Sequence, residues 1–344
     1  MTIFIKDDLR ASVEAATGGL CTVLYTQKSQ PTFMRTLPKF NLEDIDPALG
    51  TGTHPAFIVG GQEVDSIQIG MYQGIRKSGE LLSLPGVIPS VSATHQNFLN
   101  DARACGAGFG LTTNAAYAAL ALWTAKNGTE PRGNTNWGRH HLMTYETAVR
   151  QDGGSIGEAA GDGKTLTGSG PSSWRHDGSP AGIADLVGNI WEFSPGVRLV
   201  DGEIQIIANN DAALLGTLDD SAPWKAILES GSLVAPGTAN TLKYHTNNGI
   251  EIGTTIDKTK ASASKAFSTI SAVSGITIPA IMKSLMLAPS LSVEGTLYAN
   301  DEGERYPYRG GDWGASGSAG LGALYLGSAA SSASNHLGAR PAKV

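Results

Sequence analysis

Short stretches in which apolar and polar residues alternate recur along the chain, and this period of two predicts β-strands. Each stretch is only a few residues long and is bounded by Gly, Pro, Asn or Asp, so the pattern implies many turns. Strands are expected at seven places: 3–5, 21–25, 57–59, 67–73, 190–193, and within 197–210 and 242–256.

Two longer segments instead show the spacing of apolar residues that is typical of helices. The first spans 92–105 and is followed by Gly106, a stop signal. The second begins after Thr113, a good N-cap, and ends where Asn127 is followed by glycine. A third, short helix is expected at 221–230, where a proline lies in the first turn.

The composition favours a fold rich in loops and argues against strongly charged partners. Gly accounts for 44 of 344 residues, about twice its usual share. Charged residues are 16% of the chain, well below the usual quarter or so. The net charge is −6 and no basic stripe is visible, which argues against a nucleic-acid partner. Residues 128–183 read as one long loop region, and such loops are usually functional or stabilised by an ion.

Residues 1–48 read as a separate small β-rich module, with a turn or linker at 41–47. The first eight residues have neither a basic nor an apolar region, so no signal peptide is expected. The longest apolar stretch, 115–123, is too short to span a bilayer, which argues against membrane insertion. Cys21 and Cys105 are isolated, and they suggest neither a metal site nor a disulfide framework.

The C-terminal tail combines a filler-like composition with ordered motifs at both ends. It begins with Arg-Gly-Gly-Asp-Trp at 309–313 and closes with Asn-His-Leu-Gly-Ala-Arg-Pro at 335–341. Between Asp312 and Arg340 there is no Asp, Glu, Lys or Arg, and Gly, Ala and Ser dominate. Composition alone would make this run a linker or a close-packed core segment. The motifs that bracket it favour a scaffold whose displayed side chains are free to change.

Two motifs in the second half carry a family resemblance. The first is Gly-Ile-Ala-Asp-Leu-Val-Gly-Asn-Ile-Trp-Glu-Phe at 182–193, and the second is the Arg-Gly-Gly-x-Trp start of the tail together with its Leu-Gly-x-Arg end. In this order, and after a helix pair, they resemble the formylglycine-generating-enzyme branch of the C-type lectin fold. The resemblance implies an α+β domain over 49–344 with an insertion at about 197–300. It also implies that Trp191 packs in the core and that Arg340 closes the domain.

Within that branch, the tail resembles the variable proteins of diversity-generating retroelements, which include phage tropism determinants. Their template-like tail has a fixed frame, and the frame positions in this chain are Trp313, Ala319, Gly320, Ala323, Leu324, Leu326, Ala329, Ser331, Asn335, Gly338 and Arg340. Most departures from it fall where the template has Asn. In such systems, mutation of adenines turns an Asn codon into codons for Gly, Ala, Ser, Tyr, His or Asp, the types seen here. The resemblance therefore implies a variable region at 309–341.

The resemblance implies a function in recognition, with no catalysis and no required cofactor. The expected role is that of a phage receptor-binding protein at the tip of a tail fibre, made in the host cytoplasm and carried on the virion. Its partners would be a host-surface protein or glycan and other tail proteins, and by analogy it would be a homotrimer attached through residues 1–48. The variable positions expected to contact the ligand are Asp312, Gly314, Ala315, Gly322, Tyr325, Gly327, Ser328, Ser332, Ser334 and His336.

The resemblance also implies a structural Ca²⁺ beside the first motif. Its ligands would be the side chains of Asp185 and Glu192 and the carbonyls of Gly188 and Ile190. A hard cation prefers several such oxygens. The alternative is that Asp185 caps a turn and that Glu192 is salt-bridged or solvated.

Two other functions stay open at this point. A cell-surface variable protein would share the fold but needs an export signal, and none is visible. An oxidoreductase of the formylglycine-generating type would use a Cys pair near the C-terminus, whereas no Cys follows Cys105. Related sulfoxide synthases need a His-based iron site, and the one His cluster, His140-His141, lacks the required spacing. A loop pair is the alternative interpretation of these two histidines.

Overall fold

The computed structural model of the chain describes residues 7–247, 249–256 and 261–344. It confirms a mixed α+β fold that is dominated by sheet. The strand expected at 3–5 lies outside the described residues. None of the helices within the described part is both long and apolar enough to cross a membrane.

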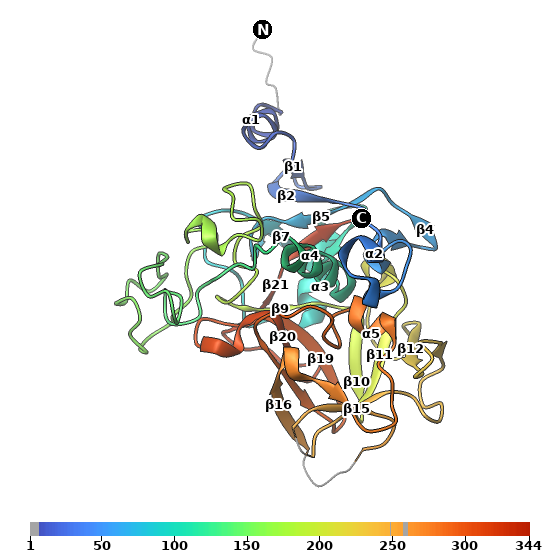
Figure 1. Cartoon of the computed structure of the whole chain (residues 1–344). Helices are drawn as coiled ribbons and strands as arrows, with labels where there is room; N and C mark the ends of the chain where they lie inside the picture. The colour runs from blue at the N-terminus through green and yellow to red at the C-terminus, as the bar shows by residue number, and fades with distance from the viewer. Residues whose placement is uncertain (1–6, 248, 257–260) are drawn as a thin grey trace.

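A five-stranded sheet joins the two ends of the chain (Figure 1). Helix α1 (Asp8–Thr17) packs against its first strand. The order of the strands is β1 (Cys21–Tyr25), β2 (Pro31–Pro38), β5 (Ser66–Gly70), β22 (Pro341–Lys343) and β8 (Phe109–Leu111). Because β2 pairs with β5, the strands of residues 21–38 continue the sheet that also holds the C-terminal strand. The role of 1–48 in attachment stays a prediction.

Both long helices that the sequence predicts are present. Helix α3 (His95–Ala104) begins after Thr94, whose hydroxyl accepts the Asn97 N–H. Helix α4 (Asn114–Lys126) begins after Thr113, whose hydroxyl accepts the Ala116 N–H, which confirms the predicted cap. Almost every residue of α4 is buried, as expected for a helix that is apolar on all sides.

A thirteen-stranded sheet forms the other half of the molecule (Figure 1). Its main path is β16 (Ser262–Ala266), β18 (Thr296–Asn300), β20 (Gly320–Ser328), β19 (Glu304–Gly310), β10 (Val197–Val200), β11 (Glu203–Ile207), β14 (Lys243–His245), β15 (Glu251–Gly253) and β17 (Ser271–Ala272). Its side branches are β12 (Trp224–Ile227), β13 (Leu233–Val234), β9 (Trp191–Phe193) and β21 (Leu337–Ala339). The predicted strands at 190–193, in 197–210 and in 242–256 are thereby confirmed.

Smaller elements complete the chain. They are the hairpins β3 (Ile58–Val59)–β4 (Gln62–Glu63) and β6 (Gly74–Lys77)–β7 (Glu80–Ser83), helices α2 (Leu42–Ile45) and α5 (Ala280–Ser284), and six 3₁₀ turns at 47–49, 55–57, 172–174, 211–214, 267–269 and 316–318. The main core gathers side chains from α4, from β5 of the smaller sheet and from β20 of the larger one. Tyr117 of α4 also donates its hydroxyl to the Leu321 carbonyl of β20, at 3.1 Å.

The helix predicted at 221–230 is wrong, because this segment holds strand β12. Trp224 and Ala226 are buried on either side of the exposed Lys225, which is the alternation of a strand. Residues 224–226 pair with residues 205–207 of β11. The neighbouring strand supplies backbone partners that the proline-led pattern of the sequence did not reveal.

Candidate functional site

The tail is built into the sheet and is not a linker. Strand β20 pairs with β19 on one side and with β18 on the other. Leu321, Ala323, Leu324 and Leu326 have no exposed surface. The leucines of this strand therefore anchor the tail in the main core.

Eight of the ten candidate contact positions are exposed or partly buried. They are Asp312, Gly314, Ala315, Tyr325, Gly327, Ser332, Ser334 and His336. The structure buries the other two, Gly322 and Ser328. A Cβ atom on Gly322 would lie 2.8 Å from the Phe267 ring, so this position packs against the 3₁₀ turn at 267–269 and does not face outward.

A row of half-buried aromatic rings crosses the sheet at the variable strand. Tyr325 stacks on Tyr298 of β18, with ring centroids 4.8 Å apart and planes 11° apart, and lies 5.7 Å from the Trp191 ring. A Cβ atom on Gly327 would lie 2.6 Å from Tyr298 and 2.7 Å from Tyr325, so glycine there leaves room for the stack. Trp191 is partly buried and packs against the core cluster that contains Phe193 and Leu337, so it lies at the edge of the core.

The loop at the start of the tail is held by a second aromatic group. Trp313 is 8% exposed, as expected of a scaffold residue, and the Lys164 ammonium lies 4.7 Å from its ring centre. His336 lies 6.3 Å from the Trp313 ring, edge to face. Trp137 reaches the same loop, because a Cβ atom on Gly314 would lie 3.2 Å from its ring. The small variable residues of the loop therefore lie among fixed aromatic side chains.

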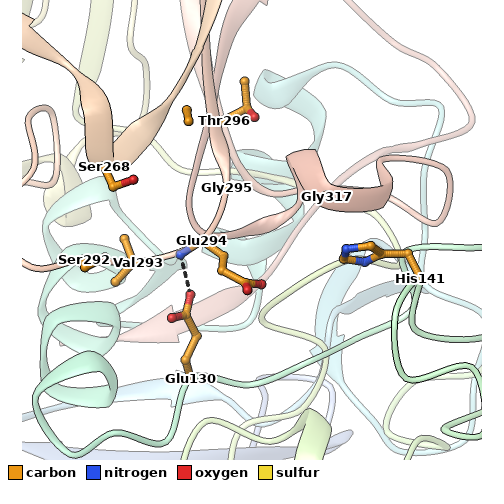
Figure 2. Close-up of a pocket in the computed structure, with 10 residues that line it drawn as sticks. Glu130, His141, Ser268, Ser292, Val293, Glu294, Gly295, Thr296 and Gly317 are labelled. Atoms are coloured by element: carbon orange, nitrogen blue, oxygen red, sulfur yellow. Dashed lines mark hydrogen bonds between the residues drawn. The ribbon is translucent and has the colours of Figure 1, made fainter.

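A pocket of about 370 Å³ opens beside this loop, and most of its lining lies outside the variable region. Figure 2 shows Glu130 and Glu294 on one side, His141 across from them, and Gly317 of the tail between. Ser268, Ser292 and Thr296 also line the pocket, so its surface is rich in carboxylates and hydroxyls. Such groups suit a hydroxylated or cationic ligand group.

The Glu130 carboxylate connects the pocket to the tail strand. It accepts the N–H of Glu294 at 2.9 Å and also the N–H of Leu321. Burial raises the pKa of Glu130 to about 7, although both N–H donors favour the ionised form. Its charge therefore changes close to neutral pH.

The four residues of the implied metal site come together, but around a side-chain amide. Gln73 Nε2 lies 3.1 Å from the Asp185 carbonyl, 3.3 Å from that of Gly188 and 3.1 Å from that of Ile190. It also lies 3.1 Å from Glu192 Oε1. Gln73 itself has no exposed surface.

The two carboxylates of this site have protein partners. Asp185 Oδ2 accepts the N–H of Gly168 at 2.7 Å, and burial raises the pKa of Asp185. The Glu192 carboxylate accepts two hydrogen bonds from Arg340, at 2.8 and 2.7 Å. Arg340 also donates to the Gly70 and Ala184 carbonyls and so ties both sheets together. A turn-bound Asp185 and a salt-bridged Glu192 match the alternative interpretation given above.

The cysteines and the histidine pair are engaged in local structure. Cys21 and Cys105 are buried and free, and burial raises the pKa of both thiols. His140 Nδ1 accepts the Met143 N–H at 3.0 Å, and His141 Nδ1 lies 2.9 Å from the Thr135 hydroxyl. Both rings are thus placed by their own loop.

Sequence reasoning missed Gln73 and Tyr298. Gln73 ends a predicted strand and has no motif of its own, and Tyr298 lies outside the variable region. No local signal marks either residue, since their partners lie far away in the chain.

No protein-family model matches this chain, and no curated protein matches it significantly. Function is therefore inferred from the residues and their geometry.

Proposed function

We propose that this chain is a C-type lectin domain of the formylglycine-generating-enzyme type that acts in recognition and not in catalysis. In this proposal it is a phage receptor-binding protein, carried at the tip of a tail fibre as a homotrimer. Its C-terminal region binds a protein or glycan of the host surface and is diversified by a retroelement. Residues 1–48 attach the domain to other tail proteins.

One observation carries the proposal: the leucines and the terminal arginine of the tail are buried, whereas most of its candidate variable positions reach the surface. Leu324, Leu326 and Arg340 have no exposed surface, whereas eight of the ten candidate positions are exposed or partly buried, as are the frame residues Ala329, Ser331 and Asn335. A segment of this kind tolerates exchange of its surface residues, because substitutions away from buried groups change stability by only about 0.5 kcal/mol each.

The chemistry of the exposed set supports binding. Tyr325 provides a rigid, half-buried ring amid Gly and Ser, a mixture typical of antibody contact surfaces. Trp191 and Tyr298 extend this ring into a row that lies outside the variable positions. Few large groups contact the ligand at each site, so display of several copies would raise the overall avidity.

The test is an exchange of seven of the exposed or partly buried variable residues for a different set, with Gly327 kept because a Cβ atom there would lie 2.6 Å from Tyr298. We expect the purified variant to lose binding to the original host surface and to keep its melting temperature within a few degrees. Gly322→Leu is the matched control inside the same strand. It should destabilise the fold by about 1–3 kcal/mol through overpacking against Phe267. Global unfolding of the seven-residue exchange would contradict the proposal, as would unchanged binding.

A genomic observation tests the diversification separately. The neighbouring genome should contain a reverse-transcriptase gene and a near-copy of the DNA that encodes the tail. If both are missing, the proposal that a retroelement diversifies the tail is wrong. Ligand recognition through the row of Tyr325, Tyr298 and Trp191 is still tested by the exchange.

A further inference from the structure

The cluster around Gln73 has the shape of a cation site. Three main-chain carbonyls and one carboxylate oxygen surround Gln73 Nε2 at 3.1–3.3 Å. An amide group has only two hydrogens to donate, so four acceptors are more than it needs. A shell of carbonyl and carboxylate oxygens is instead the kind of environment that a hard cation takes.

The backbone of the turn brings these oxygens together. Asp185, Gly188 and Asn189 have φ angles of 56°, 78° and 66°, in the left-handed region. Only glycine fits at position 188, because a Cβ atom on Gly188 would lie 2.3 Å from the Asn134 carbonyl oxygen. The turn holds its carbonyls toward one point, and this arrangement does not depend on Gln73 alone.

The orientation of the amide is determined by its other end. Gln73 Oε1 accepts a hydrogen bond from Asn189 Nδ2 at 2.8 Å. Asn189 Oδ1 in turn accepts the Thr165 N–H at 2.8 Å, so the Asn189 amide cannot be reversed without losing this bond. The nitrogen of Gln73 therefore belongs among the four oxygens.

The negative charge of the cluster is already balanced within the chain. The Glu192 carboxylate accepts both Nε and an Nη atom of Arg340. The Asp185 carboxylate points away from the cluster, to the Gly168 N–H, and contributes only its main-chain carbonyl. The fixed charge that would attract a divalent ion is thus neutralised by a buried arginine.

These observations do not fit a bound calcium ion. Ca²⁺ needs six to eight oxygens at about 2.3–2.6 Å, whereas Gln73 Nε2 itself occupies the point where the four oxygens converge. We infer that the Gln73 amide takes the place of a structural cation in this fold, so that the domain folds and binds without calcium.

The first experiment measures the full-length protein. Its melting temperature is compared in EDTA and in millimolar CaCl₂, and bound metal is measured by mass spectrometry after dialysis. We expect a shift below about 1 °C, since a ligand that does not bind the native state cannot stabilise it. A saturable rise in melting temperature, or one equivalent of calcium retained on dialysis, would overturn the inference.

The second experiment turns the cluster into a metal site. Gln73→Glu replaces the donating nitrogen with an oxygen, so the oxygens then need a proton or a cation between them. We expect this variant to melt well below the wild type in EDTA and to regain about 4 °C when calcium is present at a hundred times its Kd. Gln205→Glu is the matched control, because Gln205 is also buried but bonds to side chains, with no carbonyl shell.

The outcomes are distinct. Rescue of Gln73→Glu by calcium, with none for Gln205→Glu, supports a cation-shaped cluster that the amide fills. A Gln73→Glu variant that ignores calcium, or that stays unfolded in calcium, would show that the oxygens do not form a cation shell and would overturn that part of the inference. Neither outcome tests whether the variable positions of the tail bind a ligand. This experiment and the one on the proposed function can therefore fail independently.

Discussion

The loop region 128–183 and the tail 309–341 are both rich in glycine, yet they are ordered in different ways. The tail contains a nine-residue strand with neighbours on both sides, and four apolar residues of this strand are fully buried. All of the loop region is described by the structure, and its regular structure amounts to the 3₁₀ turn Ser172–Trp174 and isolated bridges. It also exposes large apolar side chains, among them Leu142 at 66% and Tyr145 at 78%.

A few charged side chains hold the loop region together. The guanidinium of Arg150 donates to the carbonyls of Ser155, Glu158 and Ala160 and pairs with Asp152. In the same way, the Glu146 carboxylate accepts hydrogen bonds from Arg132 and from the Trp174 indole. These side chains replace the backbone partners that a sheet would supply.

The comparison shows two solutions for a segment that lacks large apolar residues. In the tail, stabilisation is spread over a ladder of backbone bonds, so individual surface residues can change. In the loop region it is concentrated in single side chains, so few of them can be replaced. A variable surface therefore suits the tail better than the loop.

The largest expected effect comes from changing a buried residue of the tail, compared with the same change at an exposed residue of the loop region. Leu324→Ala should lower the free energy of unfolding by about 2–5 kcal/mol, because it leaves a cavity in the core. Leu142→Ala, the matched change in the loop, should alter it by less than about 0.5 kcal/mol. Urea unfolding of both variants provides the measurement, and equal effects would remove the distinction.

A smaller, local effect is expected for Arg150→Ala. It removes charge-assisted hydrogen bonds to three carbonyls of a largely exposed loop, where water can replace part of them. The amides of 150–162 should therefore exchange hydrogen faster, with little change in β20. Arg150→Lys keeps the charge but loses the fork of donors, so it should lie in between. Exchange that rises equally in the loop and in β20 would show that the two regions unfold together.

The smallest effect concerns Glu130, which lies in the loop region and accepts an N–H from the tail strand. Its folded pKa, about 7, is above its unfolded value of 4.5, so the folded state binds the proton more tightly. The stabilising contribution is present below about pH 4.5 and is lost as pH rises toward 7. Glu130→Gln should reduce this pH-dependent change in the free energy of unfolding by about 1–2 kcal/mol, a figure that allows for the partial exposure of Glu130.

Melting temperatures at pH 5 and pH 7.5 check this sign. Glu294→Gln removes an exposed carboxylate from the same pocket and should reduce the slope only slightly, because burial raises the pKa of Glu130 more than the charge of Glu294 does. A steeper slope in Glu130→Gln would contradict the pKa direction.

Several elements could be predicted because their signals are local. Helix α4 has its cap at Thr113 and its stop at Asn127-Gly128, all within the helix or one residue of it. Strand β9 follows directly from the apolar end of the motif at 182–193. Strand β20 of the tail was not predicted, since its frame came only from the resemblance to variable proteins and its leucines at 321, 324 and 326 do not alternate strictly.

Other features could not be predicted because their causes lie far away in the chain. The segment 221–230 looks helical by itself and becomes β12 only because β11 offers a free edge. Gly322 looks like the other candidate variable positions in the sequence, but it is buried against Phe267. Tyr298 lies beside the variable residue Tyr325 because β18 pairs with β20 in this register.

The sequence by itself therefore determined the two long helices, the cap at Thr113 and several of the strands, while the division of the tail into frame and replaceable positions stays a prediction. These features depend on residues only a few positions apart, so their periodicity and capping can be recognised in the sequence. Only the tertiary structure decided which tail residues reach the surface and what fills the oxygen cluster at Asp185. Gln73 meets Ile190 across more than a hundred residues, and no local pattern encodes a hydrogen bond that only the packing of two sheets brings together.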